Sequence, residues 1–366
     1  MALLSPDRTT PARAAGDRAA VLPLVLAVLV VAAFGGWRTI GNVTAAPEPS
    51  AAAIEDVMGS LGLSDPAGLE ATDPAAAATS PSTVAPPALL APAGAPAKWL
   101  PSGKGMWIYL PDKTEGGNVD AIVTKAKATG LTHLWVRMGS AWDGFNVVPF
   151  VNRLLPAAHA AGIKVIGWDF PKLEPWEKDV ERALTMIRHT TPSGHRIDAF
   201  SADIETRAEG TRITAESARS YGAALRAGVG PDYPLIATVP RPSKERASFP
   251  YDAVVADYDA IAPMVYWLNR QPDTDVAGAL RDLAHFGKPV YPIGQAYDGF
   301  PEGGRRGVPP PEELHRFITT AAKHGAAGVS FWSWQAANQP AWDAIREAVE
   351  FRAADQPGLA ADAFSR

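Results

Sequence analysis

The stretches KVIGWD (residues 164–169) and AFSADIE (residues 199–205) flank a helical pattern at residues 176–189, and the three form one strand–helix–strand unit. Strands that are largely apolar and joined by helices are typical of a parallel sheet covered on its outer face. The same alternation recurs eight times along the chain. We expect strands at residues 106–110, 133–138, 164–169, 199–205, 235–239, 260–267, 289–295 and 328–334.

Helical patterns separate these strands, and several of them end in a glycine, as helices commonly do. They span residues 119–129, 150–161, 176–189, 214–227, 252–257, 276–286, 311–324 and 340–351. Eight such units in about 250 residues predict an α/β fold, a (β/α)8 TIM barrel over residues 99–352. An open doubly wound sheet is the alternative, but the eight cycles and the lack of a glycine-rich dinucleotide turn argue against it.

Composition excludes several classes of protein. The 366 residues are 47% hydrophobic and 20% charged, with a formal net charge of -5. An acidic chain is an unusual nucleic-acid binder, so we expect no nucleic-acid partner. The chain has no cysteine, which removes disulfides, thiolate metal sites and cysteine nucleophiles. None of the seven histidines forms a ligand pair at helical spacing, so we expect neither a metal site nor a cofactor.

The first hundred residues differ from the rest. Residues 19–37 form an uncharged apolar run that nearly spans a bilayer, and Arg8, Arg13 and Arg18 precede it. The positive-inside rule makes residues 1–18 a cytoplasmic tail and places the barrel outside a cell membrane that the chain crosses once. A cleaved signal peptide, followed by secretion, is the alternative because residues 43–45 are small.

Two further segments are predicted to lie outside the folded part. Residues 38–98 are rich in alanine and proline and nearly lack aromatic residues, so we expect a disordered linker. Residues 353–366 are expected to form a C-terminal tail.

Barrel enzymes carry their chemistry at the C-terminal ends of the strands. Asp203 and Glu205 end the fourth predicted strand and, being two apart, point to one side, about 7 Å from each other. Because they repel and are partly desolvated, one should hold a proton near neutral pH while the other stays ionised. Such a pair can protonate a glycosidic oxygen. A salt-bridged structural pair or ligands for a hard metal ion are the alternatives.

The same strand carries a family resemblance. Asp198-x-x-Ser201-x-Asp203-x-Glu205 resembles the strand-4 signature D-x-x-D-x-D-x-E of chitinase-type (family 18) glycoside hydrolases, with Ser201 in place of the second aspartate. The resemblance implies that Glu205 is the general acid and that Asp203 orients the N-acetyl group of the substrate. The D-x-E pair also resembles, more distantly, lysozyme-type (family 25) muramidases. Those enzymes usually carry an acid at the end of strand 1, which residues 106–110 lack.

Strands 6 and 8 extend the resemblance. Met264-x-Tyr266-Trp267 is similar to the M-x-Y-D of family 18, with Trp267 in place of the aspartate. By this likeness Tyr266 is a catalytic residue that hydrogen-bonds the N-acetyl group. The eighth strand ends Phe331-Trp332-Ser333-Trp334, where the family keeps a tryptophan under the sugar.

Further residues at strand ends are candidates for substrate binding. A flat aromatic ring suits the face of a pyranose, and of the two tryptophans on strand 8 we favour Trp334 as the platform; core packing is the alternative for all of the tryptophans. Arg137 lies inside an apolar strand, where a lone charge is unfavourable, so we expect it to pair with a neighbouring carboxylate, for which Glu205 and Asp169 are the candidates. The complete set is Arg137, Asp169, Trp267, Gln295, Trp332, Trp334 and Gln335.

These observations predict a membrane-tethered, extracytoplasmic barrel of the glycoside hydrolase type. Its expected partner is a carbohydrate polymer, a polysaccharide or a cell-wall glycan, besides the membrane itself. A catalytically silent carbohydrate-binding barrel is the alternative, because Ser201 and Trp267 depart from the chitinase pattern.

Overall fold

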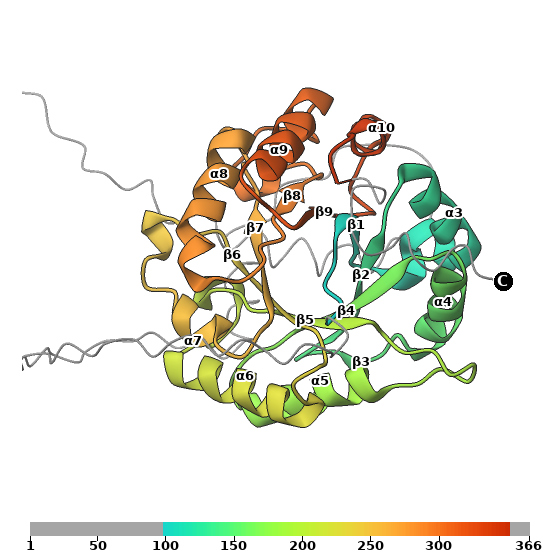
Figure 1. Cartoon of the computed structure of the whole chain (residues 1–366), viewed down its shortest axis with the longest axis vertical. Helices are drawn as coiled ribbons and strands as arrows, with labels where there is room; N and C mark the ends of the chain where they lie inside the picture. The colour runs from blue at the N-terminus through green and yellow to red at the C-terminus, as the bar shows by residue number, and fades with distance from the viewer. Residues whose placement is uncertain (1–97, 352–366) are drawn as a thin grey trace, which may run out of the picture. The chain divides into compact units, whose positions relative to one another are not determined.

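The computed structural model of the chain describes residues 98–351, which form a closed barrel ringed by helices (Figure 1). All pairs between neighbouring barrel strands are parallel, and the first strand pairs with both the second and the last, which closes the sheet. The barrel strands are β1 (Gly103–Ile108), β2 (His133–Ser140), β4 (Lys164–Phe170), β5 (Ala199–Asp203), β6 (Leu235–Pro240), β7 (Ala260–Val265), β8 (Ile293–Gln295) and β9 (Gly328–Trp332). The predicted (β/α)8 barrel is confirmed.

Helices follow the barrel strands and cover the outer face of the sheet (Figure 1). They are α3 (Val119–Thr129), α4 (Val148–Ala160), α5 (Trp176–Arg188), α6 (Ala215–Val229), α7 (Tyr251–Val255), α8 (Pro272–Leu283), α9 (Pro311–Lys323) and α10 (Gln339–Glu347). An element that the sequence did not predict, β3 (Gly144–Phe145), pairs antiparallel with the end of β2. Short 3-10 turns lie in the loops, at η1 (Pro111–Gly117), η2 (Arg207–Glu209), η3 (Lys244–Arg246), η4 (Ala284–Phe286) and η5 (Phe300–Glu302).

Local sequence accounts for these elements, and α3 is an example. The side chain of Asn118 accepts hydrogen bonds of 3.1 Å from the backbone N–H groups of Asp120 and Ala121, which caps the N-terminus. Gly130 ends the helix in the left-handed conformation, with a φ of 71°. Between them Ile122 and Ala126 recur at helical spacing and are buried on one face.

The interior of the barrel is filled by aromatic side chains. The rings of Trp107 and Trp135 stack with centroids 4.6 Å apart, and Trp168 lies 5.4 Å from Trp107. The indole N–H of Trp107 donates to Ser330 Oγ at 2.9 Å. Gly105 lies beside this packing, and a Cβ there would come within 2.2 Å of the His133 ring, so only glycine fits. The barrel is therefore a packed core, and any site must lie above it, at a strand end.

Four predicted strands end two residues earlier than expected. β1 ends at Ile108 rather than Leu110, β5 at Asp203 rather than Glu205, β7 at Val265 rather than Trp267, and β9 at Trp332 rather than Trp334. The alternation of side chains between the two faces of a strand stops with the strand. The directions predicted for the residues beyond these ends were therefore unreliable.

Within residues 98–351 no helix is both long enough and apolar enough to cross a membrane. The predicted cytoplasmic tail, membrane or signal segment and C-terminal tail lie outside the described residues, as does the predicted linker up to residue 97.

Candidate active site

Asp203 is the last residue of β5, and its carboxyl group is buried at the top of the barrel core. Its side chain is 7% exposed, and Oδ1 has no hydrogen-bond partner within the described residues. Ser201, two residues below, does not provide one, because its hydroxyl lies 2.8 Å from Thr238 Oγ1. Burial raises the pKa of Asp203 to about 8, and the charges of Glu209 and Asp169 add to this shift, while Arg137 opposes it.

Glu205 lies two residues beyond β5 and is half-buried. Burial is the largest cause that raises its pKa well above the usual range. Repulsion from Glu209 and Asp203 and a hydrogen bond with Glu209 raise the pKa further. We expected one of the two acids to be protonated and the other ionised. The structure instead raises the pKa of both, because both carboxyl groups are buried and lie near other acids.

Tyr266 follows β7 and faces the same carboxyl groups. Burial raises the pKa of its phenol well above 10, and the charges of Asp203 and Glu205 are the next causes. The phenol therefore stays protonated and can donate a hydrogen bond. Its ring meets Tyr297 edge-on, with centroids 5.4 Å apart, and the Tyr297 hydroxyl donates to Glu302 Oε2 at 2.7 Å.

Two acids of this site, Glu209 and Glu302, were not predicted. Glu209 lies in η2, where Oε2 accepts from the backbone N–H of Thr206 at 3.0 Å and from its hydroxyl at 2.6 Å. Glu302 lies in η5. Burial and the charge of Glu209 raise its pKa, whereas the hydrogen bond from Tyr297 and the charge of Arg246 lower it. Glu209 could have been predicted from its position four residues after Glu205. Glu302 could not, because it lies in a long loop whose path the sequence does not indicate.

Arg137 faces the barrel mouth from β2, but its partner differs from both candidates. Its Nη2 bonds Asp143 Oδ2, in the loop after β2, and its guanidinium carbon lies 5.1 Å above the Tyr109 ring. Arg137 thus pairs with a neighbouring carboxylate, as predicted, but the partner is Asp143 rather than Glu205 or Asp169. Arg137 still lowers the pKa of Asp203 through space, so it is close enough to contribute to the site.

Asp169 does not lie in the mouth. It is fully buried between the sheet and α5, where Arg182 donates to both of its oxygens over 2.8–3.2 Å. Arg182 also bonds Asp179 Oδ1 at 2.7 Å. Asp169 is part of a structural ion-pair network, and its expected contact with substrate is wrong.

Trp267 and Trp334 also point away from the mouth. The indole N–H of Trp267 donates to Glu313 Oε2 at 2.8 Å, and its ring packs against Phe317 of α9. The indole N–H of Trp334 donates to Glu115 Oε1 at 3.0 Å, and its ring meets Trp342 of α10. Both predicted sugar contacts are wrong, because each residue lies beyond the end of its strand.

The side-chain amides of Gln295 and Gln335 form hydrogen bonds with backbone groups of the loops around the mouth. Gln295 accepts from Leu268 N at 2.8 Å and donates to Tyr297 O at 3.2 Å. Gln335 donates to Leu110 O at 3.2 Å and accepts from the N–H of Tyr109 at 3.4 Å. These amides hold the loops around the mouth together, so the predicted role as hydroxyl ligands is not supported.

Two other tryptophans are placed to meet a ligand. Trp332 is partly exposed above the core, with ring centroids 5.6 Å from both Tyr109 and Trp168. Trp142, in the loop after β2, is 61% exposed and lies 4.9 Å from the ring of Phe170. A Cβ on Gly210 would lie 3.5 Å from Trp142, which places this ring beside the loop that carries Glu209.

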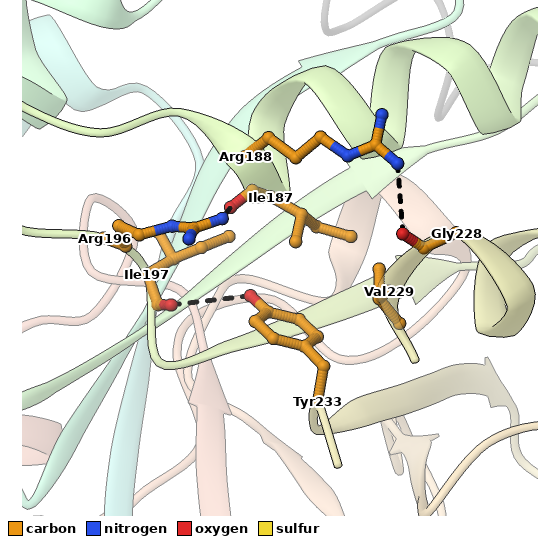
Figure 2. Close-up of a pocket in the computed structure, with 7 residues that line it drawn as sticks. All are labelled: Ile187, Arg188, Arg196, Ile197, Gly228, Val229 and Tyr233. Atoms are coloured by element: carbon orange, nitrogen blue, oxygen red, sulfur yellow. Dashed lines mark hydrogen bonds between the residues drawn. The ribbon is translucent and has the colours of Figure 1, made fainter. Parts of the chain in front are cut away.

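A hollow of about 340 Å³ lies away from these acids, between the C-terminal ends of α5 and α6. Figure 2 shows the residues that line it. There Arg188 donates to Gly228 O at 3.1 Å and Arg196 to Ile187 O at 3.2 Å, so each arginine binds a carbonyl in the last turn of a helix (Figure 2). A second hollow of about 70 Å³ includes Gln295. Neither is lined by Asp203 or Glu205. In residues 98–351, no group of three or more His, Asp or Glu side chains is arranged to hold a metal ion.

No protein-family model matches the sequence, and no curated protein matches it significantly. The solved structures that it resembles are glycoside hydrolase barrels. A family 18 chitinase of Flavobacterium johnsoniae is 11% identical, with a TM-score of 0.49 over 68% of this chain and 93% of the other. A chitinase of Chromobacterium violaceum is 12% identical, with a TM-score of 0.48 over 68% and 99%. An endo-1,4-β-mannanase of Rhizomucor miehei is 10% identical, with a TM-score of 0.48 over 63% and 86%. The barrel itself is established by its strand pairing.

Proposed function

We propose that this barrel is a glycoside hydrolase acting on a polysaccharide or a cell-wall glycan, with Glu205 as its general acid. One observation carries the proposal. Asp203 and Glu205 lie together at the C-terminal end of a barrel strand, and burial raises the pKa of both carboxyl groups. A protonated carboxyl group at neutral pH is what a glycosidic leaving group requires.

The chemistry follows from these protonation states. The Glu205 proton passes to the glycosidic oxygen as the bond from that oxygen to the anomeric carbon breaks. Water then adds its hydroxyl group to the anomeric carbon and gives its other proton to the Glu205 carboxylate, which restores the acid. Positive charge develops at the sugar ring during this step, and it favours loss of the Asp203 proton to solvent, so that the carboxylate stabilises the charge. The Tyr266 phenol, which stays protonated, donates a hydrogen bond to the substrate. The family 18 likeness implies that the acceptor is the N-acetyl group of a hexosamine.

Aromatic rings provide the binding surface in this proposal. Trp332 and Tyr109 form an apolar floor on top of the barrel core, and Trp142 provides an exposed second ring. Pyranose faces pack well on such rings. A platform at the floor and another in an exposed loop suit a chain of several sugars.

Screening the purified protein against chitin fragments, peptidoglycan and plain glucans tests this proposal. We expect release of reducing ends from at least one polymer by the wild type and by Glu174→Gln. Glu174 is an exposed acid whose ion-pair partner is Arg212, at 3.4 Å, so its variant is a matched control. If none of the polymers is cleaved, the hydrolase proposal fails.

A silent carbohydrate-binding barrel is the second candidate, and the burial of Asp203 favours it. Asp203 is 7% exposed as a residue, which leaves little of it open to a substrate, and Ser201, which replaces an acid of the family 18 signature, is bonded within the core. This candidate predicts that glycans bind but stay intact. Loss of glycan binding in Trp142→Ala, with no cleavage by the wild type, would establish it.

We further propose that residues 19–37 anchor the chain in the cell membrane with the barrel outside, on the linker of residues 38–98. The support is the uncharged apolar run and the arginines before it. Protease added to intact cells should remove the barrel from membrane-bound protein. A barrel that is protected until the cells are lysed would show that the orientation is wrong, and a shortened chain in the medium would show cleavage.

A further inference from the structure

The hollow between α5 and α6 lies at the opposite end of the strands from the acids of the mouth (Figure 2). Ile197 and Tyr233, which line it, come just before β5 and β6, whereas Asp203 ends β5. Its volume of about 340 Å³ falls at the lower end of the ~300–1,000 Å³ that is typical of small-molecule sites. We call it the basal hollow, and the proposed hydrolysis does not use it.

Two arginines border the basal hollow without a counter-charge. The Arg188 guanidinium donates one hydrogen bond, to Gly228 O at 3.1 Å, and the Arg196 guanidinium donates one, to Ile187 O at 3.2 Å. Within residues 98–351 neither arginine forms an ion pair with a carboxylate. A guanidinium has five N–H donors, so most donors of both side chains remain open to a ligand. Two positive charges beside one hollow attract an anion into it.

The other walls of the basal hollow are mostly hydrocarbon. Ile187 and Ile197 are buried, and Val229 packs against the core. The Tyr233 ring lies on another side, and its hydroxyl donates to Ile197 O at 3.4 Å (Figure 2). This distance is long for a hydrogen bond from a hydroxyl group, so the hydroxyl is weakly held and can donate to a ligand instead.

We propose that the basal hollow binds a small carboxylate with an apolar body. A guanidinium suits a planar carboxylate because two parallel N–H donors can bind both of its oxygens. The hydrocarbon walls suit the rest of such a ligand, whereas they would leave the hydroxyl groups of a sugar without partners. The site is separate from the mouth in place and in chemistry, and it does not depend on the proposed hydrolysis.

A ligand-observed NMR titration of the full-length protein with three probes tests the inference. The carboxylate probe is 3-phenylpropionate. The amide 3-phenylpropanamide has the same shape without the charge, and acetate has the charge without the apolar body. We expect 3-phenylpropionate to bind with a Kd of about 1 mM or below, and at least about tenfold more tightly than either control. Added salt should weaken this binding, because it screens the two arginines.

Variants locate the bound carboxylate. Arg188→Gln and Arg196→Gln should each weaken binding of 3-phenylpropionate by about fivefold or more, because each removes one charged donor group. The two arginines come from α5 and from the loop before β5, so misfolding of one variant leaves the other informative. Arg153→Gln is the matched control. Arg153 also donates to one carbonyl, Pro149 O at 3.1 Å, but it lies on α4 and does not line the hollow, so its variant should bind like the wild type.

Three results would overturn the inference. The first is absence of 3-phenylpropionate binding at concentrations up to about 10 mM. The second is binding of the amide as tight as that of the carboxylate, which would remove the role of the charges. The third is unchanged binding of the carboxylate in both Arg188→Gln and Arg196→Gln, which would place the ligand elsewhere.

Discussion

At the residue scale, the raised pKa of Asp203 makes folding depend on pH. Its carboxyl group holds a proton in the folded chain up to about pH 8, whereas in the unfolded chain it ionises near pH 4. The stability associated with this proton is fully present below pH 4 and is lost as the pH rises toward 8.

We therefore predict that Asp203→Asn stabilises the protein above pH 4. Asparagine keeps the shape and does not ionise, so the gain should be near zero at pH 4 and on the order of 1 kcal/mol or more at pH 8. Thermal melts of both proteins across this range measure it. A difference in Tm that stays constant from pH 4 to 8 would show that Asp203 has an ordinary pKa.

A second residue-scale prediction concerns Trp142. Because its ring is 61% exposed, Trp142→Ala should lower the free energy of unfolding by only about 0.5 kcal/mol. Glycan binding should weaken by about 1–2 kcal/mol if the ring stacks on a sugar. Urea unfolding and fluorescence titration separate the two effects. Binding as tight as that of the wild type would exclude Trp142 from the site.

At the element scale, β4 and α5 are joined by a buried ion pair. Asp169 is fully buried, and Arg182 is its cation, so Arg182→Leu leaves an uncompensated charge in the core. The variant should lose about 3 kcal/mol of unfolding free energy in urea titrations. Arg188→Leu on the same helix removes an exposed arginine and should lose about 0.5 kcal/mol or less. Equal losses in both variants would mean that the pair with Asp169 adds nothing.

The sequence predicted the elements better than the side-chain directions at their ends. Eight apolar stretches separated by helical patterns are a strong signal, and each coincides with a barrel strand. Trp267 and Trp334 lie two residues beyond β7 and β9, where period-two alternation no longer applies. Their partners, Glu313 and Glu115, lie 46 and 219 residues away along the chain. No local pattern contains such contacts, so the packing of these rings could not be predicted.

Some acids of the site could not be predicted either, because their contacts also join distant parts of the chain. Asp203 and Glu205 were found because two carboxyl groups at the end of a barrel strand are unusual. Glu302 joins the site through Tyr297, whose hydroxyl donates to its carboxyl group and whose ring meets Tyr266. The partner of Arg137 was missed for a related reason, since Asp143 lies in a loop whose path depends on β3.

At the scale of the whole molecule, residues 98–351 contain a closed sheet and its covering helices. Because β1 pairs with β9, the barrel needs no other segment to complete its hydrogen bonding. We predict that a protein truncated to these residues folds and unfolds in one cooperative transition, as followed by circular dichroism. A broad, non-cooperative melt would show that residues before 98 or after 351 are required.

The proposed hydrolysis depends on Glu205 delivering a proton to the glycosidic oxygen. Turnover of a cleaved glycan should therefore be compared between the wild type and Glu205→Gln, because glutamine keeps the shape and cannot donate the proton. We predict that turnover falls by about 100-fold or more while glycan binding is retained. Unchanged turnover in Glu205→Gln would contradict the assignment.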